Sequence, residues 1–403
     1  MKKPLMLVVL GSAVAGGVIL QRRKRSPAGA VTPRYPEFVP EGFTPELFEV
    51  TTDDGLTLRG KRYANRDATP LILLAGFGGN GFNYDIAFER SNFAVYLARK
   101  GYDVWVGNFR GTGREPYKSD GGDFSHYIQD LCIHDMPALI RRVTESTGKK
   151  PVLMGHSMGG VVCYGYLQGV DYHEEDGKRD LRPDIDLARE RNDSVAAVVS
   201  LTGPASFYWP KDCWHYWLVA SPFSRFFLRG LRAWLIRLAR RANQVPIESS
   251  VINLINRAPG LAYIVLKAGY SLFANLRNMN REMLFEAWLS GLSDVSIREA
   301  YQLVNALLTR DLVGSSAMEG EDGDGQHNFT KSMHLVSAPI LFIVGELDIV
   351  NASVLYRDGY QQVSSRTKDY NCFKGYGHMD LIQGLEISTT VLPYVTDWLE
   401  KVI

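Results

Sequence analysis

The chain has 403 residues, of which 45% are apolar and 22% charged, and its formal net charge is +1. This length allows a large buried core and is long for one α/β domain without an insertion. The near-zero charge gives no reason to expect nucleic acid or another polyanion as a partner of the whole molecule.

The amino terminus is predicted to be a separate element. Residues 4–20 carry no charge and as a helix would extend about 26 Å, close to the hydrocarbon thickness of a bilayer. We expect a single-pass membrane anchor at 1–25 and a Pro- and Gly-rich linker at 26–42. Four basic residues follow the apolar span and two precede it, which favours the cytoplasmic side for the remaining chain. A cleaved signal peptide is the alternative, because residues 13–15 resemble a cleavage site.

The first part of the core contains a glycine-rich loop. A hairpin is predicted over residues 47–63, and the apolar strand 70–74 then runs into a loop with four glycines. Such a loop lets the backbone approach a ligand closely, so we expect the amide of Phe77 to be an oxyanion donor. A phosphate-binding loop is the alternative, but the Lys-Ser/Thr ending is missing. A helix over 84–100 and a strand over 102–106 follow.

The segment 151–160 fits a strand, a sharp turn and a helix start. An apolar run ends in Gly155, Ser157 lies at the tip, and Gly159 opens the next apolar segment. Only small residues fit two positions before and two after a serine in such a strained turn. The pattern predicts that Ser157 is a nucleophile and that the amide of Met158 is the second oxyanion donor.

A serine nucleophile needs a base and an acid, which in this kind of fold follow in the order Asp or Glu, then His. Residues 339–344 read as a buried strand, and Asp348 stands just past its end, where ligands bind in an open α/β sheet. His378 follows a turn after the next strand. We therefore predict a triad of Ser157, His378 and Asp348, with Glu346 as the reserve acid.

Two further segments resemble the acid lipases, the family of the lysosomal and gastric enzymes. They are 101–111, after the first core helix, and 378–384, around the histidine, with an acidic residue two places on. Ala75 departs from the family pattern, which has a histidine there. The resemblance implies catalytic roles for Ser157, Asp348 and His378 and oxyanion roles for Phe77 and Met158.

Residues 205–336 are helical and aromatic in pattern, and an insertion at this point is where such hydrolases place a cap. Aromatic residues cluster at its start. They either line an acyl-chain pocket, in which case Trp209, Trp214 and Trp217 bind substrate, or form the core of the cap.

One helix in this insertion, predicted over 224–243, places most of its arginines on one half and most of its large apolar residues on the other. It is either an interfacial membrane segment or a cap helix that packs inward with a solvated arginine face. The charged stretch 171–193 is expected to be a surface insertion, and the acidic run 319–324 a flexible loop and not a calcium site.

These observations predict an α/β-hydrolase fold, with a mostly parallel sheet, helices on both faces and a helical cap. The expected divisions are an anchor (1–25), a linker (26–42), core (43–204), cap (205–336) and core (337–403). We predict a serine hydrolase that cleaves apolar carboxylic esters, with membrane lipid as a further partner and no nucleic acid. An acyltransferase or polyester-synthase-like enzyme and a non-catalytic lipid-binding protein are the alternatives.

No metal or organic cofactor is expected, and the sequence does not indicate an oligomeric state. The four cysteines show no paired metal-ligand spacing, so reduced and mostly buried thiols are predicted. They are Cys132, Cys163, Cys213 and Cys372.

Overall fold

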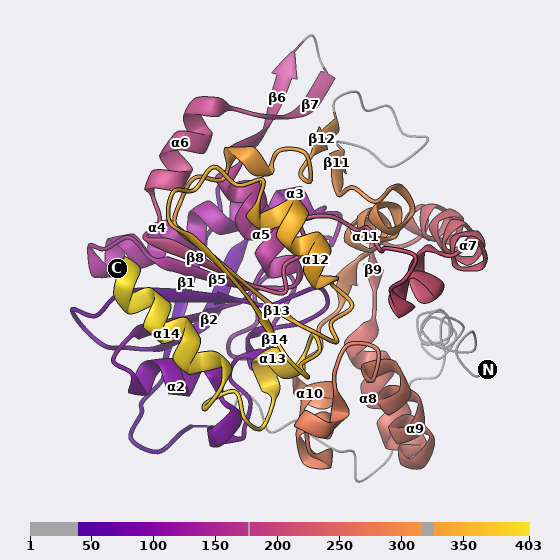
Figure 1. The fold of residues 1–403 in the computed structure, drawn as a ribbon, viewed down its shortest axis with the longest axis horizontal. Coiled ribbons are helices and arrows are strands. Elements are labelled where there is room, and N and C mark those ends of the chain that lie inside the picture. The colour runs from indigo at the N-terminus through magenta and orange to yellow at the C-terminus, as the bar shows by residue number, and fades with distance from the viewer. Residues whose placement is uncertain (1–38, 176–177, 316–325) are drawn as a thin grey trace.

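The computed structural model describes residues 39–175, 178–315 and 326–403 (Figure 1). The predicted anchor at 1–25, most of the linker and the acidic run 319–324 lie outside these residues. Across the part of the chain that is described, no helix combines the length and apolar character needed to cross a membrane.

An eight-stranded sheet forms the centre of the molecule, in the order β1-β2-β4-β3-β5-β8-β13-β14 (Figure 1). The β1–β2 and β2–β4 pairs are antiparallel, and every other pair is parallel. This arrangement confirms the predicted α/β-hydrolase fold. The strands are β1 (Glu46–Thr51), β2 (Thr57–Tyr63), β3 (Pro70–Leu74), β4 (Asp103–Gly107), β5 (Val152–His156), β8 (Ala197–Leu201), β13 (Ile340–Gly345) and β14 (Lys368–Phe373).

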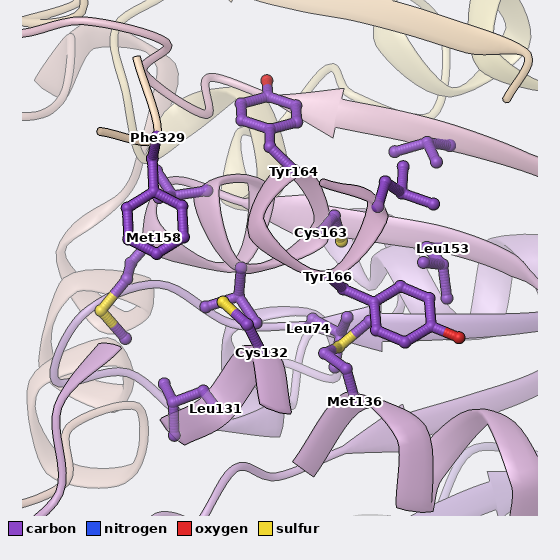
Figure 2. Close-up of a cluster of buried hydrophobic side chains, with 14 of the residues drawn as sticks. Leu74, Leu131, Cys132, Met136, Leu153, Met158, Cys163, Tyr164, Tyr166 and Phe329 are labelled. Atoms are coloured by element: carbon purple, nitrogen blue, oxygen red, sulfur yellow. The ribbon is translucent and has the colours of Figure 1, made fainter. Parts of the chain in front are cut away.

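Helices cover both faces of this sheet, so its central strands are buried on both sides. Alternate side chains of β3 face opposite ways: Ile72 and Leu74 join one apolar cluster, and Leu71 and Leu73 join another. The first cluster lies under α4 (Met136–Thr147) and α5 (Met158–Leu167), and the second under α2 (Phe93–Arg99) and α14 (Val391–Val402). Figure 2 shows part of the first cluster around α5, with Met158, Cys163 and Tyr164 on this helix and Leu131 and Cys132 on the segment before α4.

The helix predicted over 84–100 is wrong in its first half, since α2 begins only at Phe93. Asn92 caps α2 by accepting a hydrogen bond from the amide of Val95. Before it, Asp85 is fully buried and accepts hydrogen bonds from Lys61 (2.6 Å), Tyr63 (2.6 Å) and Asn92 (2.8 Å). A buried carboxylate requires such partners, and two of them, Lys61 and Tyr63, come from β2, so tertiary contacts override the helical pattern.

The stretch 171–193 is more ordered than a simple surface excursion. It forms the hairpin of β6 (Val170–Glu175) and β7 (Lys178–Pro183), followed by α6 (Ile185–Asp193).

Between β8 and β13 the chain forms a mainly helical region at one end of the sheet (Figure 1). Two short strand pairs, β9 with β10 and β11 with β12, accompany the helices. The helices are η4 (Tyr216–Ala220), α7 (Pro222–Ala239), α8 (Ile247–Arg257), α9 (Pro259–Tyr270), η5 (Leu276–Asn278), α10 (Arg281–Ser290), α11 (Ile297–Thr309) and η6 (Met333–Leu335); the strands are β9 (Gln244–Val245), β10 (Val295–Ser296), β11 (Val313–Ser315) and β12 (Gln326–Asn328).

All four cysteines are unpaired, as predicted. Cys132 and Cys163 are buried, Cys213 is partly buried and Cys372 is exposed, so the expectation of buried thiols holds for the first two.

Candidate active site

Ser157 lies at the tip of a sharp turn between β5 and α5. Its φ of 54° is in the left-handed region, which is strained for a residue with a side chain. A Cβ on Gly155 would lie 2.4 Å from the backbone of Gly159, and a Cβ on Gly159 would lie 2.4 Å from the carbonyl oxygen of Leu74. The turn is therefore possible only with glycine at both positions, as the sequence pattern indicates.

His378 and Asp348 lie together after neighbouring strands. Asp348 follows β13 and His378 follows β14, and the two strands pair in parallel. The Nδ1 of His378 is 2.9 Å from Oδ1 of Asp348, and both side chains are buried. The same carboxylate oxygen accepts a hydrogen bond from the amide of Val350 at 2.7 Å. Glu346, the reserve acid, is exposed and instead accepts a hydrogen bond from the amide of Gly375.

His156 brings the histidine loop to the serine turn, a role that the sequence pattern did not predict. Its ring centroid is 4.7 Å from that of His378, and its Nε2 is 3.1 Å from the carbonyl oxygen of His378. Complete burial, and then the charge of His378, hold the pKa of His156 well below its usual value. His156 is therefore neutral and donates its Nε2 proton to that carbonyl. Its place directly before Ser157 was the available sequence signal.

The glycine-rich loop after β3 also lies against the serine turn. A Cβ on Gly76 would lie 2.8 Å from Cβ of Ser157, so the loop passes close to the serine at Gly76. Phe77 is the next residue in this loop. Met158 starts α5, and its side chain lies in the core cluster of Figure 2. The predicted oxyanion residues thus come from the two segments that flank Ser157.

Asparagines organise this loop, in which Ala75 replaces the histidine of the acid lipases. Asn108 accepts a hydrogen bond from the amide of Gly81 at 2.8 Å, and Asn80 accepts one from Phe82 at 3.0 Å. The side-chain amide of Asn80 also donates to the carbonyl of Ser290 at 2.9 Å. The loop is therefore tied both to the core and to the insertion between β8 and β13.

Asp380 connects the histidine loop to the same insertion. Its Oδ1 accepts hydrogen bonds from the amides of Gly377 (3.0 Å) and Asn275 (2.9 Å), and its Oδ2 accepts one from the side chain of Asn278 (2.6 Å). The amide of Met379 donates to the carbonyl of Phe273 at 2.8 Å. These bonds clasp the residues around His378 to residues 273–278. The acidic residue two places after the histidine was the only sign of this link in the sequence.

The three tryptophans predicted to bind substrate occupy different surroundings. Trp209 is buried in the core, and its indole N–H donates to the carbonyl of Ile349 at 2.8 Å. Trp214 lines a cavity of about 340 Å³ together with residues 271–272, residues 274–277 and Leu347, the neighbour of Asp348 in the sequence. Trp217 is 70% exposed and is not among the lining residues. Of the three, Trp214 is therefore best placed to meet a bound molecule.

Asp53, Asp54 and His134 lie close enough to share a metal ion. Arg110 already pairs with Asp54 at 2.7 Å, and His134 lies 2.6 Å from Asp53. Both carboxylates thus already have partners within the chain.

Part of this chain is similar in sequence to known hydrolases and lipases. A family model described as the alpha/beta hydrolase fold matches residues 69–171. Lipase 1 of Drosophila melanogaster is 33% identical over 126 residues, which is 29% of this chain and 28% of that protein. Human gastric triacylglycerol lipase is 32% identical over 137 residues, 30% of this chain and 34% of that protein. The chain thus matches about a third of the length of these relatives.

Solved structures are similar to this chain in fold over most of its length, although their sequences are only distantly similar. A thermophilic esterase from Thermogutta terrifontis has a TM-score of 0.54 at 15% identity and covers 89% of this chain and 99% of its own. An alpha/beta hydrolase from Penicillium sp. sh18, GrgF, has a TM-score of 0.55 at 17% identity, with the same two coverages. At these identities the likeness concerns the fold alone.

Proposed function

We propose that this chain, which has the α/β-hydrolase fold and is distantly homologous to the acid lipases, is a serine hydrolase that cleaves carboxylic esters of apolar substrates. One observation carries the proposal. Ser157 is in a strained turn, and His156, the residue before it, contacts the His378 of a buried His378–Asp348 pair; such a strained residue calls for a functional reason.

The proposed mechanism follows from the proton positions that the hydrogen bonds require. Since Asp348 accepts from Nδ1 of His378, the other ring nitrogen, Nε2, is free to take the proton of Ser157. The serine oxygen then forms a bond to the ester carbonyl carbon, and the carbonyl oxygen becomes an oxyanion beside the amides of Phe77 and Met158. His378 returns the proton to the departing alcohol, and an acyl-enzyme remains. Water, activated by the same histidine, releases the acid.

The apolar substrate class is supported by two independent facts. Trp214, Leu272 and Leu347, the residue before Asp348, line part of one cavity. The curated relatives over the matched third of their length are named lipases. Longer acyl chains gain binding energy from apolar burial, about 0.8 kcal/mol for each buried methylene.

The direct test is a fluorophosphonate label together with a panel of esters of increasing chain length. The wild-type protein should be labelled covalently at Ser157 and should prefer the longer esters. Ser157→Ala should lose labelling and lower turnover by on the order of 10⁴ to 10⁶. Ser353→Ala, at an exposed serine on α12 (Ala352–Leu355), is the matched control and should retain both.

More than about a hundredth of the activity left in Ser157→Ala would contradict the assignment. Ester products formed with an added alcohol would identify an acyltransferase, and the absence of labelling would favour a lipid-binding protein.

A further inference from the structure

Helix α7 uses its apolar side for packing within the insertion. Leu228 and Leu235 are buried in a cluster with residues of α11, and Leu231 and Trp234 are packed against it. The amphipathic pattern of this helix is thus explained by its inner face. The opposite face is what an external partner would meet.

The outer side of α7 carries large aromatic side chains at its amino-terminal end. Phe223 is 62% exposed and Phe226 79% exposed, and Trp217 in the preceding turn is 70% exposed. Phe223 and Phe226 are three residues apart and therefore lie near each other on the first turns of the helix. Exposing three large aromatic rings in one short segment is costly in water and typical of a contact surface.

Arginines continue the same face toward the carboxyl end. At about 100° per residue, Arg229, Arg237 and Arg240 lie within about 60° of Phe226 around the helix axis. All three are exposed, and within the described residues none has an acidic partner. Helix α7 itself contains no acidic residue. By contrast, Arg225 and Arg232 are directed to α11, where they donate to Leu308 and Asn305.

We propose that this α7 surface, formed by Trp217, Phe223, Phe226, Arg229, Arg237 and Arg240, docks on an anionic lipid bilayer. Aromatic rings are favoured at the boundary between headgroups and acyl chains, and arginines are attracted to the lipid phosphates. The uncompensated positive charge identifies the partner as an anionic surface. Helix α9 is a useful contrast, because Leu261 and Ile264 are also exposed but no row of cations accompanies them.

The α7 surface lies near the cavity that Trp214 lines. Trp214 lies three residues before Trp217 and lines the cavity beside Leu347. Docking would therefore bring the lipid close to that cavity. The docking itself goes beyond the proposed function, because it does not require turnover.

The test uses the full chain carrying Ser157→Ala, which separates docking from catalysis. The protein is mixed with vesicles of phosphatidylcholine, alone or with phosphatidylglycerol, that contain brominated lipid, a short-range quencher of tryptophan fluorescence. Because the reading is local to Trp217, it reports docking of α7 whether or not another segment attaches the chain to the vesicle. The share due to Trp217 is obtained by comparison with Trp217→Phe.

Quenching at Trp217 should appear with anionic vesicles and decrease in high salt, which screens surface charge. The combined change of Arg229 and Arg237 to Gln should weaken docking by on the order of tenfold. Phe223→Ser with Phe226→Ser should weaken it similarly, whereas Leu261→Ser with Ile264→Ser, the matched control, should not. The melting temperatures of the variants should match that of the parent.

Three results would overturn the proposal. One is equal quenching in the parent and in Trp217→Phe. Another is quenching that is as strong in neutral vesicles and insensitive to the arginine changes. The third is a concentration-dependent burial of Trp217 without lipid, which would assign the α7 surface to a second copy of the chain.

Discussion

The serine turn and the helical insertion are built in different ways. Around Ser157, the backbone of Gly155 packs directly against the backbone of Gly159, four residues later. A Cβ at either glycine would overlap with main-chain atoms. In the insertion, helices meet through side chains that are distant in sequence, such as those joining α7 to α11. The first region therefore has almost no tolerance for substitution, whereas the second can vary as long as the inner faces of its helices are filled.

The histidine loop belongs to both regions. His156 contacts it from the serine turn, and Asp380 clasps it to residues 273–278 of the insertion. Substitutions at the turn should therefore have larger effects than substitutions at this clasp, and substitutions within the insertion should have the smallest.

Asp348→Asn should lower turnover by about 10⁴, because an asparagine favours the wrong tautomer of His378. Kinetics at saturating ester, with the fold checked by circular dichroism, would measure the effect. Glu346→Gln is the matched control, since Glu346 is exposed and bonded to Gly375, and it should be mild. The reverse result would show that the acid is misassigned.

Gly159→Ala tests how rigid the serine turn is. The added methyl would lie 2.4 Å from the carbonyl oxygen of Leu74, which is main chain and cannot rotate away. We expect a loss of about 3 kcal/mol or more in the free energy of unfolding, as for other overpacked sites. Gly230→Ala on α7, where no atom lies within 4 Å of the new Cβ, should be neutral or stabilising. Equal denaturation midpoints for the two variants would refute the contrast.

Asp380→Asn tests the clasp between the two regions. The new NH2 group would face hydrogen-bond donors on Gly377, Asn275 or Asn278, so the loop that carries His378 should shift. A positioning role predicts a fall in kcat of about 10- to 100-fold with little change in KM. Asn278→Ala should act in the same direction from the side of the insertion. Glu386→Gln, an exposed acid nearby, is the control, and an unchanged kcat in the Asp380 variant would rule the role out.

Glu299→Gln tests the packing of α11 against the core, where Glu299 lies 3.6 Å from His126. Burial raises the pKa of Glu299 from its usual 4.5 to about 8. Between these pH values the folded protein retains a proton that the unfolded chain releases, so stability should fall as the pH rises toward 8. Burial lowers the pKa of His126 to about 3, which acts in the opposite sense only below its usual 6.5.

The glutamine resembles the protonated acid and removes this dependence. Between pH 6 and pH 8, the free energy of unfolding of Glu299→Gln should decline less than that of the parent, by about 2 kcal/mol. Urea unfolding at both pH values measures the difference. Parallel stability curves would mean that Glu299 does not retain its proton in the folded protein.

Local signals in the sequence were sufficient for the parallel strands and the serine turn. Strands buried on both faces appear as continuous apolar runs, and a turn that excludes every Cβ requires glycines at set positions around Ser157. The order of Asp348 and His378 after their strands was also readable, because the ends of parallel strands meet at one edge of the sheet.

Only the tertiary structure decided the start of α2, the role of His156 and the clasp made by Asp380. Each depends on partners that are distant in sequence, such as Lys61 for Asp85 or Asn278 for Asp380. The hydropathy pattern of α7 likewise allowed either a packed or a lipid-facing apolar side, and packing against α11 made the choice. Periodicity defines the faces of a helix, but which face is covered depends on the elements that fold against it.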